Sequence, residues 1–416
     1  MNMKRFCKPG TCALVVLMLL TASLTDNALH AGEPPLKKDI QLNTSQRRML
    51  ENNNDFACDL LRTVTRQQQG STIVSPISVS YMLGMLNAGA QGETQRQIAD
   101  VLGMGDDVKG VNTCFKKLID GAPYLDAKAK VRIANAIFAN SGLGISLVPQ
   151  YKIDMETWYN AQIEALDFGN SRNVNVINDW CDTHTNGMIP KILDRLTPDA
   201  AMYLLNAVYF KATWAMKFDP DETHDRNFTK QNRTTVMRPM MHLKTRAAYS
   251  ENGLYKMLSL PYGDKAYSMW VILPDKGISV NEIIDRLTAQ ELKQQRHAMR
   301  TVQVDILIPR FTTTSDTDLK DVLSSMGMPL AFDRDFAEFP NMAQNRELYV
   351  SMMKQKARIE VNEEGTKAAA VTIAQMTNRS ASSAMGYTFH ATRPFIYFIV
   401  EEGSGAIFFM GTYCGD

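Results

Sequence analysis

The sequence has few cysteines, no long run of one charge and no low-complexity tract. Its six cysteines include no CxxC pair, which argues against a zinc knuckle and a dense disulfide framework. Lysine and arginine number 45 against 44 acidic residues, and a formal net charge of +1 argues against nucleic-acid binding through a strong basic field. With 416 residues and 45% hydrophobic content, the chain can build one large globular domain or two ordinary ones.

Known catalytic and cofactor motifs are also missing. None of the six histidines belongs to an HExxH zinc helix, and there is no Walker loop and no convincing GxGxxG. Gly403-Ser404-Gly405 lacks the outer glycines of a nucleophile elbow. The stretch from Asp219 has His224 where a calcium loop needs glycine. We therefore predict a protein that is not an enzyme and has no metal and no cofactor, with a cryptic hydrolase as the alternative.

The first thirty residues have the pattern of a targeting signal. A basic start is followed by the apolar run 13–20 and then by small residues. The run is shorter than the roughly 20 apolar residues that a membrane span needs, so it fits a secretory signal. We predict a signal peptide and cleavage region over residues 1–31, cut after Ala22 or Ala31, with an uncleaved anchor as the alternative. The mature protein would have no membrane span and would be secreted or extracellular, or periplasmic if the source is bacterial.

Four cysteines remain after such a cut, and their spacing cannot select disulfide partners. Free buried cysteines and one or two disulfides are both compatible with the sequence. The four are Cys58, Cys114, Cys181 and Cys414.

Two hydrophobic periodicities alternate along the rest of the chain, without an internal repeat or a long linker. Apolar spacing of three to four residues predicts helices, and strict alternation predicts half-buried strands. The predicted helices are 45–68 and 75–87, and the predicted strands are 131–137, 302–308 and a buried hairpin over 394–410. We therefore predict a single α+β domain over residues 45–416, preceded by an N-terminal lead-in at 32–44.

The most informative segment is 365–386, which follows an alternating strand pattern at 355–364. It contains twelve Ala, Ser or Thr residues, only two charges and no proline. Surface loops are usually richer in Gly, Pro, Asn and Asp. Read as a strand, the segment has one face of small side chains, formed by Thr366, Ala368, Ala370, Thr372 and Ala374. The pattern indicates a loop that can join a sheet, and a plain linker is the alternative.

Several blocks, in order and at family spacing, resemble the serpin family over nearly the whole chain from about residue 45. Residues 363–366 followed by 368–370 resemble the proximal hinge of inhibitory serpins, and 388–395 resembles the segment by which the loop rejoins the body. The further blocks are 75–78 with 89–94, 178–180 with 185–189, and 205–211 with Trp214. Together these blocks identify the chain as resembling an inhibitory serpin.

The resemblance implies a serpin-like α+β fold with three β-sheets, about nine helices and an exposed reactive-centre loop at about 363–388. It also implies a suicide substrate. A protease attacks the scissile bond, and the cut loop inserts into the main sheet and traps the protease as a covalent acyl complex. The implied hinge residues are Glu363, Glu364, Gly365, Thr366, Lys367, Ala368, Ala369 and Ala370. The implied sheet-opening cluster is Ser75, Ser78, Asn206, Gln355 and Trp214.

The reactive bond follows from the family spacing. Counting fourteen residues beyond Gly365 places it at Arg379-Ser380, whereas counting back from Phe389 places it near Ser383-Ala384. The hinge count is preferred, because the inserted length sets how far the protease travels. Arg379 before the cut implies a trypsin-like serine protease as the partner, and a cysteine protease that cleaves after Arg is also compatible.

Two features affect this interpretation. Gln355 stands where many family members carry histidine, and glutamine can hydrogen-bond but cannot titrate near neutral pH. Glycosylation sequons begin at Asn43, Asn227, Asn232 and Asn378, but a sugar at Asn378 would obstruct a protease. The lead prediction is a monomeric, exported inhibitor of Arg-specific proteases, and the alternative is a non-inhibitory serpin-fold carrier or binding protein.

Overall fold

The structure is a computed structural model that describes residues 39–344, 348–366 and 386–416. All described residues belong to one compact unit, Leu36–Asp416. The α-helices of these residues are α1 (Thr44–Gln67), α2 (Pro76–Gly89), α3 (Gly92–Leu102), α4 (Val108–Gly121), α5 (Pro149–Tyr159), α6 (Asn173–His184), α7 (Val280–Arg286), α8 (Ala289–Ala298) and α9 (Leu319–Ser325). The strands are β1 (Thr72–Val74), β2 (Ala129–Asn140), β3 (Gln162–Leu166), β4 (Met202–Thr213), β5 (His224–Thr229), β6 (Thr235–Glu251), β7 (Tyr255–Pro261), β8 (Tyr267–Pro274), β9 (Arg300–Pro309), β10 (Phe311–Asp318), β11 (Met352–Asn362), β12 (Gly365–Thr366), β13 (Tyr387–His390), β14 (Phe395–Glu401) and β15 (Ile407–Tyr413).

The helices and strands that the hydrophobic periodicity predicts are present in the structure. Helix α1 begins after Asn43, whose side chain and Gln46 form a reciprocal capping box. Helix α2 begins at Pro76, which suits a first turn because the missing N–H has no helical partner there. The alternating stretches become β2 and β9, and the C-terminal stretch becomes the fully buried hairpin of β14 and β15.

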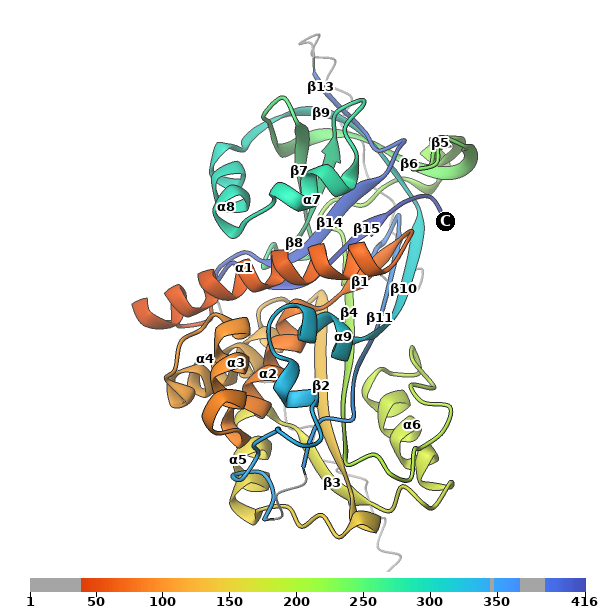
Figure 1. Cartoon of the computed structure of the whole chain (residues 1–416). Helices are drawn as coiled ribbons and strands as arrows, with labels where there is room; N and C mark the ends of the chain where they lie inside the picture. The colour runs from red at the N-terminus through yellow and green to blue at the C-terminus, as the bar shows by residue number, and fades with distance from the viewer. Residues whose placement is uncertain (1–38, 345–347, 367–385) are drawn as a thin grey trace, which may run out of the picture. The chain divides into compact units, whose positions relative to one another are not determined.

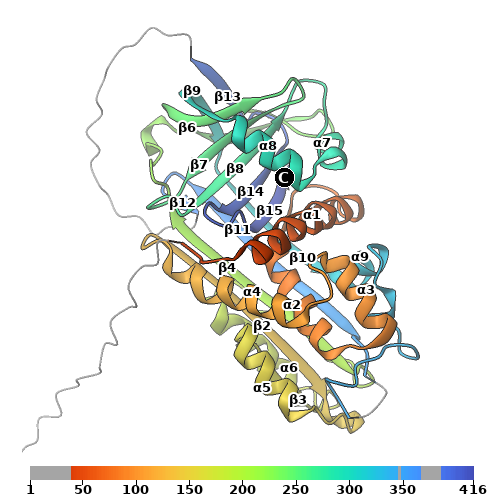
Figure 2. The same cartoon turned by 90° about the vertical axis from the view of Figure 1, so that its left-hand side faces the viewer.

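The main sheet has six strands in the order β10-β11-β12-β4-β2-β3. Strands β11 and β4 pair in parallel only over Met352–Lys356 and Tyr203–Ala207. Further along, the two-residue strand β12 lies between them and pairs antiparallel with both. Figure 2 shows β12 at the end of β4, next to β11. Among the described residues, the facing edges at 357–360 and 208–211 have no strand partner.

The second sheet has nine strands and is two parts joined by one long strand. Strand β6 pairs with β5 and β9 over most of its length, and its last residues pair with β7. One part therefore contains β5, β6, β9 and β13, and the other contains β7, β8, β14, β15 and β1. With the main sheet, these parts account for the three sheets expected of the α+β fold.

Two hydrophobic clusters hold these layers together. The larger cluster joins α1–α5 and α7–α9 to both sheets. The smaller cluster lies between α6 and the main sheet and includes Phe138, Ile177, Trp180 and Tyr203. Figure 1 shows α2, α3 and α4 on one side of the main sheet and α6 on the other. Helix α6 covers the second face at β2 and β4, whereas that face of β10 and β11 is partly exposed. A side chain that enters the sheet on the face toward α2 must therefore be small or paired.

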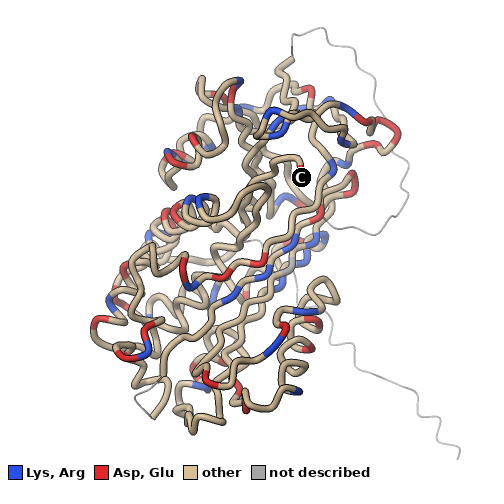
Figure 3. The backbone as a smooth tube through the Cα atoms, turned by 45° about the vertical axis from the view of Figure 1, so that its right-hand side comes forward, with Lys and Arg blue, Asp and Glu red and all other residues tan. Residues whose placement is uncertain are grey.

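The cysteines and charges of the described residues agree with the sequence-based expectations. Cys58, Cys114, Cys181 and Cys414 are free and buried, and burial raises the pKa of the Cys58 thiol to about 12. Figure 3 shows basic and acidic residues interspersed along the backbone rather than segregated by sign. No helix among the described residues is long and apolar enough to cross a membrane.

Candidate functional site: the loop hinge and the main sheet

The hinge enters the main sheet at Gly365. Gly365 pairs with Asn362 of β11 and with Thr213 of β4, at a φ of +147° that side-chain-bearing residues rarely adopt. A Cβ added at this position would lie 2.1 Å from the carbonyl oxygen of Ala212. Only glycine therefore fits at this position, because the backbone of β4 occupies the space of any side chain.

Thr366 is already buried in the sheet, with 1% of its surface exposed. Its hydroxyl lies 2.7 Å from the hydroxyl of Tyr262, so the buried polar group has a partner. Trp214 stacks on the Tyr262 ring at 4.4 Å between centroids and 10° between planes. The Trp214 indole also donates to the carbonyl of Asn362 over 2.8 Å. These contacts fix the point at which the chain turns into the sheet.

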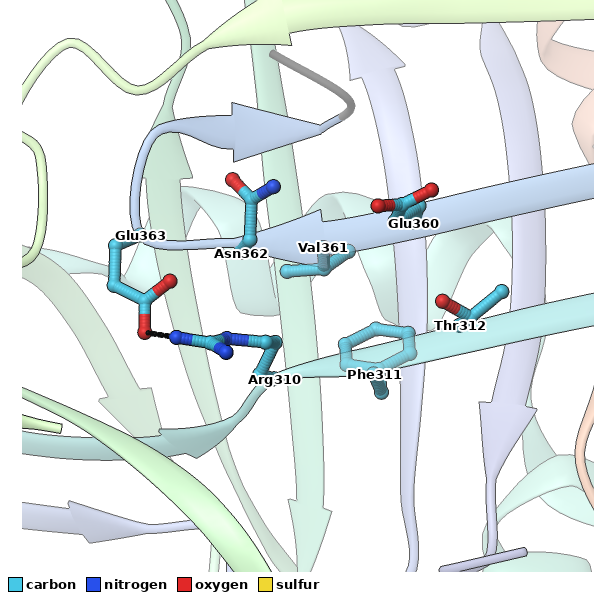
Figure 4. Close-up of a pocket in the computed structure, with 7 residues that line it drawn as sticks. All are labelled: Arg310, Phe311, Thr312, Glu360, Val361, Asn362 and Glu363. Carbon is cyan, nitrogen blue, oxygen red and sulfur yellow. Dashed lines mark hydrogen bonds and ion pairs between the residues drawn. The ribbon is translucent and has the colours of Figure 1, made fainter. Parts of the chain in front are cut away.

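The first two hinge residues are acidic and hold the turn that leads into the sheet. Glu363 accepts hydrogen bonds from Arg310 at 2.6 Å and from Thr223 at 2.7 Å, and Figure 4 shows its pairing with Arg310. Burial alone would raise the pKa of Glu363, but these hydrogen bonds outweigh it and hold that pKa below its usual value. Glu364 pairs with Lys217. The turn is thus tied to three neighbouring segments by charged side chains.

An open pocket of about 380 Å³ lies beside this turn, at the adjoining ends of β10 and β11. The Glu363–Arg310 pair lies at one end of it, with the side chains of Phe311 and Val361 beside the pair (Figure 4). The pocket belongs to the hinge surroundings.

A buried polar network lies where β11 and β4 are still paired. The Gln355 side chain accepts from the Ser75 backbone N–H at 2.8 Å, and it donates to the Ser75 carbonyl at 3.1 Å and to Asn206 at 3.2 Å. The hydroxyl oxygens of Ser75 and Ser78 are 2.8 Å apart. Asn206 donates in turn to Asn135 of β2 at 2.9 Å. The network therefore links α2 to three strands across the line along which the sheet would have to part.

The structure brings Ser75, Ser78, Asn206 and Gln355 together, but Trp214 lies elsewhere. Trp214 follows the end of β4, eight residues beyond Asn206, which corresponds to roughly 25 Å along a strand. Trp214 therefore contacts the hinge and not the polar network.

Several residues that sequence reasoning did not single out complete the site. Tyr262 partners Thr366, Arg310 partners Glu363, and Asn135 extends the polar network. No local signal marks them, because each contact joins segments at least 53 positions apart. The predicted hinge residues Lys367, Ala368, Ala369 and Ala370 and the predicted reactive bond Arg379-Ser380 lie outside the described residues.

A family model matches most of the chain. The matching family is described as Serpin (serine protease inhibitor), and the match spans residues 51–415. The chain belongs to the serpin family. The family description supports a protease inhibitor role at family level.

Individual serpins resemble this chain in sequence and in structure. Human neuroserpin is 31% identical over 353 residues, covering 82% of this chain and 84% of that protein. The crystal structure of the thermophilic serpin tengpin in its native state matches with a TM-score of 0.83 and 29% identity, over 92% of this chain and 97% of that chain. Thyroxine-binding globulin in complex with thyroxine matches with a TM-score of 0.79 and 27% identity, over 88% of this chain and 98% of that chain. The serpin fold is therefore confirmed.

The polar network leads to a first prediction, for Gln355→Ala. The variant leaves the Ser75 N–H and the Asn206 amide oxygen without a partner in a buried site, while the Ser75 carbonyl keeps its hydrogen bond from the Val79 N–H. At about 1–3 kcal/mol for each of the two unsatisfied groups, the free energy of unfolding should fall by about 2 kcal/mol or more. Thermal or denaturant unfolding measures the change. Glu360→Gln, on the outward face of the same strand, is the control and should stay within about 0.5 kcal/mol; equal effects of the two variants would contradict the assigned role of the network.

Proposed function

We propose that this serpin is an exported suicide-substrate inhibitor that traps an Arg-specific, trypsin-like protease as a covalent acyl complex. The observation that carries the proposal is the position of β12, whose Gly365 and Thr366 already lie between β11 and β4. The residues that follow are small and strand-compatible. Strand β12 therefore already occupies a position between β11 and β4, and the sequence that follows it is suited to extend that strand.

The register indicates how insertion would proceed. Each further loop residue would lie opposite one residue further back along both β11 and β4. Residues 367–370 would fill the facing edges that have no strand partner among the described residues, without breaking any strand pairing. The next residues would have to part Met352–Lys356 from Tyr203–Ala207. If the same register continued, Thr372 would lie between Gln355 and Asn206, where its hydroxyl could join the polar network.

Insertion would release enough free energy to act on a protease. At about 1 kcal/mol net for each new backbone hydrogen bond, a dozen bonds contribute on the order of 10 kcal/mol. This is comparable to the total stability of a typical domain. The driving force is therefore of the size needed to pull an acylated protease away from its substrate-bound position before deacylation.

Denaturing electrophoresis after incubation with trypsin tests the proposed function. We expect a band heavier than either protein, which persists in denaturant because the acyl bond is covalent, and a protease that has lost activity. Complete cleavage of the chain with full protease activity and no heavy band would contradict the proposal.

The target specificity leads to a second prediction, for Arg379→Ala. An arginine buried against a carboxylate in the protease pocket is worth roughly 2–5 kcal/mol when truncated, a rate factor of about 30 to several thousand. The variant should therefore nearly lose trypsin inhibition, whereas Arg379→Lys keeps the positive charge and should retain most of it. Mass spectrometry of the cleaved wild-type chain gives the new N-terminus. Ser380 would support the assignment, and Ala384 would show that the bond is shifted.

Two alternative functions are also supported by specific observations. Thyroxine-binding globulin, a structural neighbour, was crystallised with thyroxine, so a non-inhibitory carrier is the second candidate. An Arg-cleaving cysteine protease would form a thioester in place of an ester and is also compatible with the proposed reactive bond. Secretion and a monomeric state belong to the same proposal and rest on the leader pattern and on the family.

A further inference from the structure

A cluster of two histidines and one aspartate lies at the edge of the second sheet, away from the hinge. Strand β13 is the edge strand and pairs in parallel with β9, as Figures 1 and 2 show. Asp305 of β9 accepts from His242 of β6, with 2.7 Å between Oδ1 and Nε2. Its other oxygen, Oδ2, lies 3.6 Å from Nε2 of His390 on β13. One carboxylate thus bridges three adjacent strands.

The sheet register explains why these groups meet. His242 of β6 and His390 of β13 both pair with Leu307, one from each side of β9. Residues paired across strands have their side chains on the same face, and so has Asp305, two positions before Leu307. The cluster therefore forms only while β13 is paired with β9.

Other charges around the cluster are mostly positive. Lys244 of β6 lies 4.0 Å from Asp305, and Lys256 of β7 donates to the carbonyl of Thr388 on β13. Arg226 of β5 also acts electrostatically on His390. The second acidic group is Glu222 of the short helix η3 (Pro220–Glu222), which lies 3.5 Å from the other ring nitrogen of His242. Two carboxylates therefore face three permanent cations and two imidazoles that can each gain a proton.

We propose that this cluster is a pH-sensitive latch that holds β13 on β9 while both histidines are neutral and releases it when they are protonated. With neutral rings, Asp305 can accept a hydrogen bond from each histidine. With protonated rings, His242 and Arg226 repel His390, and the aspartate that attracts it is shared with His242 and Lys244. Undocking of β13 moves His390 away from these like charges.

The direction of the effect follows from the two states of His390. Burial, together with His242 and Arg226, lowers the pKa of docked His390 below its usual 6.5, against the opposite pull of Asp305. In the undocked strand the ring would titrate near 6.5. Above that pH the His390 ring is neutral in both the docked and the undocked strand, and the docked strand has its greatest stability. As the pH falls below about 6.5, the undocked strand takes up the proton more readily, and docking weakens until docked His390 is protonated as well.

The docked strand is short, so a modest electrostatic change matters. Only four residues of β13 pair with β9, and Phe389 is the one fully buried side chain among them. Because β13 is the first described strand after the proposed reactive bond, release would move the first described strand pairing beyond that bond from β13 to β14. That consequence for presenting the bond to a protease rests on the proposed function, whereas the latch itself does not.

Hydrogen-exchange mass spectrometry on the intact chain tests the latch. Rates for peptides covering β13 and β14 are compared at pH 7.5 and 5.5, after correction for intrinsic exchange at each pH. We expect the protection of β13 to fall several-fold at pH 5.5, with about tenfold per pH unit as the limit for a single proton. Protection of the buried strand β14 should stay unchanged.

Two variants distinguish the latch from a general loss of stability at acidic pH. His390→Gln cannot take up a proton and should show nearly the same β13 protection at both pH values. His297→Gln, an exposed histidine on α8, should keep the wild-type decrease. If wild-type β13 is equally protected at both pH values, or if His390→Gln loses as much protection at pH 5.5 as wild type, the latch does not exist. Both results are independent of protease inhibition.

Discussion

Replacing Thr366 with arginine is expected to convert this serpin from an inhibitor into a substrate. Thr366 is 1% exposed and its hydroxyl meets that of Tyr262, so the site accepts a small side chain with one polar atom. An arginine there would be buried without a charged partner, at a cost of several kcal/mol. At about 3 kcal/mol, the balance between insertion and deacylation would shift roughly 100-fold toward deacylation. Thr366→Arg should therefore be cut after Arg379 while trypsin stays active and no covalent complex forms.

Lys367→Glu is the matched control for this variant. In the predicted strand, residue 367 follows Thr366 and has its side chain on the opposite face of the sheet. A reversed charge there would not have to be buried, so inhibition should change little. Stoichiometric titration of trypsin against each variant measures the effect. Equal loss of inhibition in both variants would show that the inward and outward assignment of the loop is mistaken.

Cutting the loop should make the protein more stable than the intact chain. Insertion of the freed segment would add about 10 kcal/mol of backbone hydrogen bonding. A chain of this size has an unfolding entropy near 0.8 kcal/mol per degree, so the melting temperature should rise by roughly 10 °C or more. Calorimetry of the chain before and after quantitative cleavage between residues 376 and 385 measures the rise.

The Thr366→Arg variant also controls the stability experiment. Cut at the same bond, it should gain little, because its first inserted residue cannot be buried. A wild-type melting curve that is unchanged after cleavage would favour the carrier alternative, in which the loop does not enter the sheet.

Local patterns in the sequence predicted much of the fold. The alternation along β11 predicted which residues are buried, and Ala357, Ile359 and Val361 are each at most 2% exposed. Burial on one face of a strand depends on residue spacing alone, so a single sequence reveals it. The hinge was located through its resemblance to a known family.

Contacts between distant segments could not be predicted in the same way. Tyr262 and Thr366 are 104 positions apart, and neither residue type predicts a contact with the other. The need for glycine at 365 became clear only from the position of the Ala212 carbonyl. The contact of Trp214 with Asn362 and Tyr262 was likewise not predictable, because a sequence block does not show where its strand ends relative to the hinge.

A crystal structure of the chain cut after Arg379 tests the central claim most directly. The account predicts a new strand from Thr366 onward between β11 and β4, with Thr372 opposite Gln355 and Asn206. The pairing of Met352–Lys356 with Tyr203–Ala207 would then be lost. A cleaved structure in which those five pairs persist, and in which the loop remains outside the sheet, would contradict it.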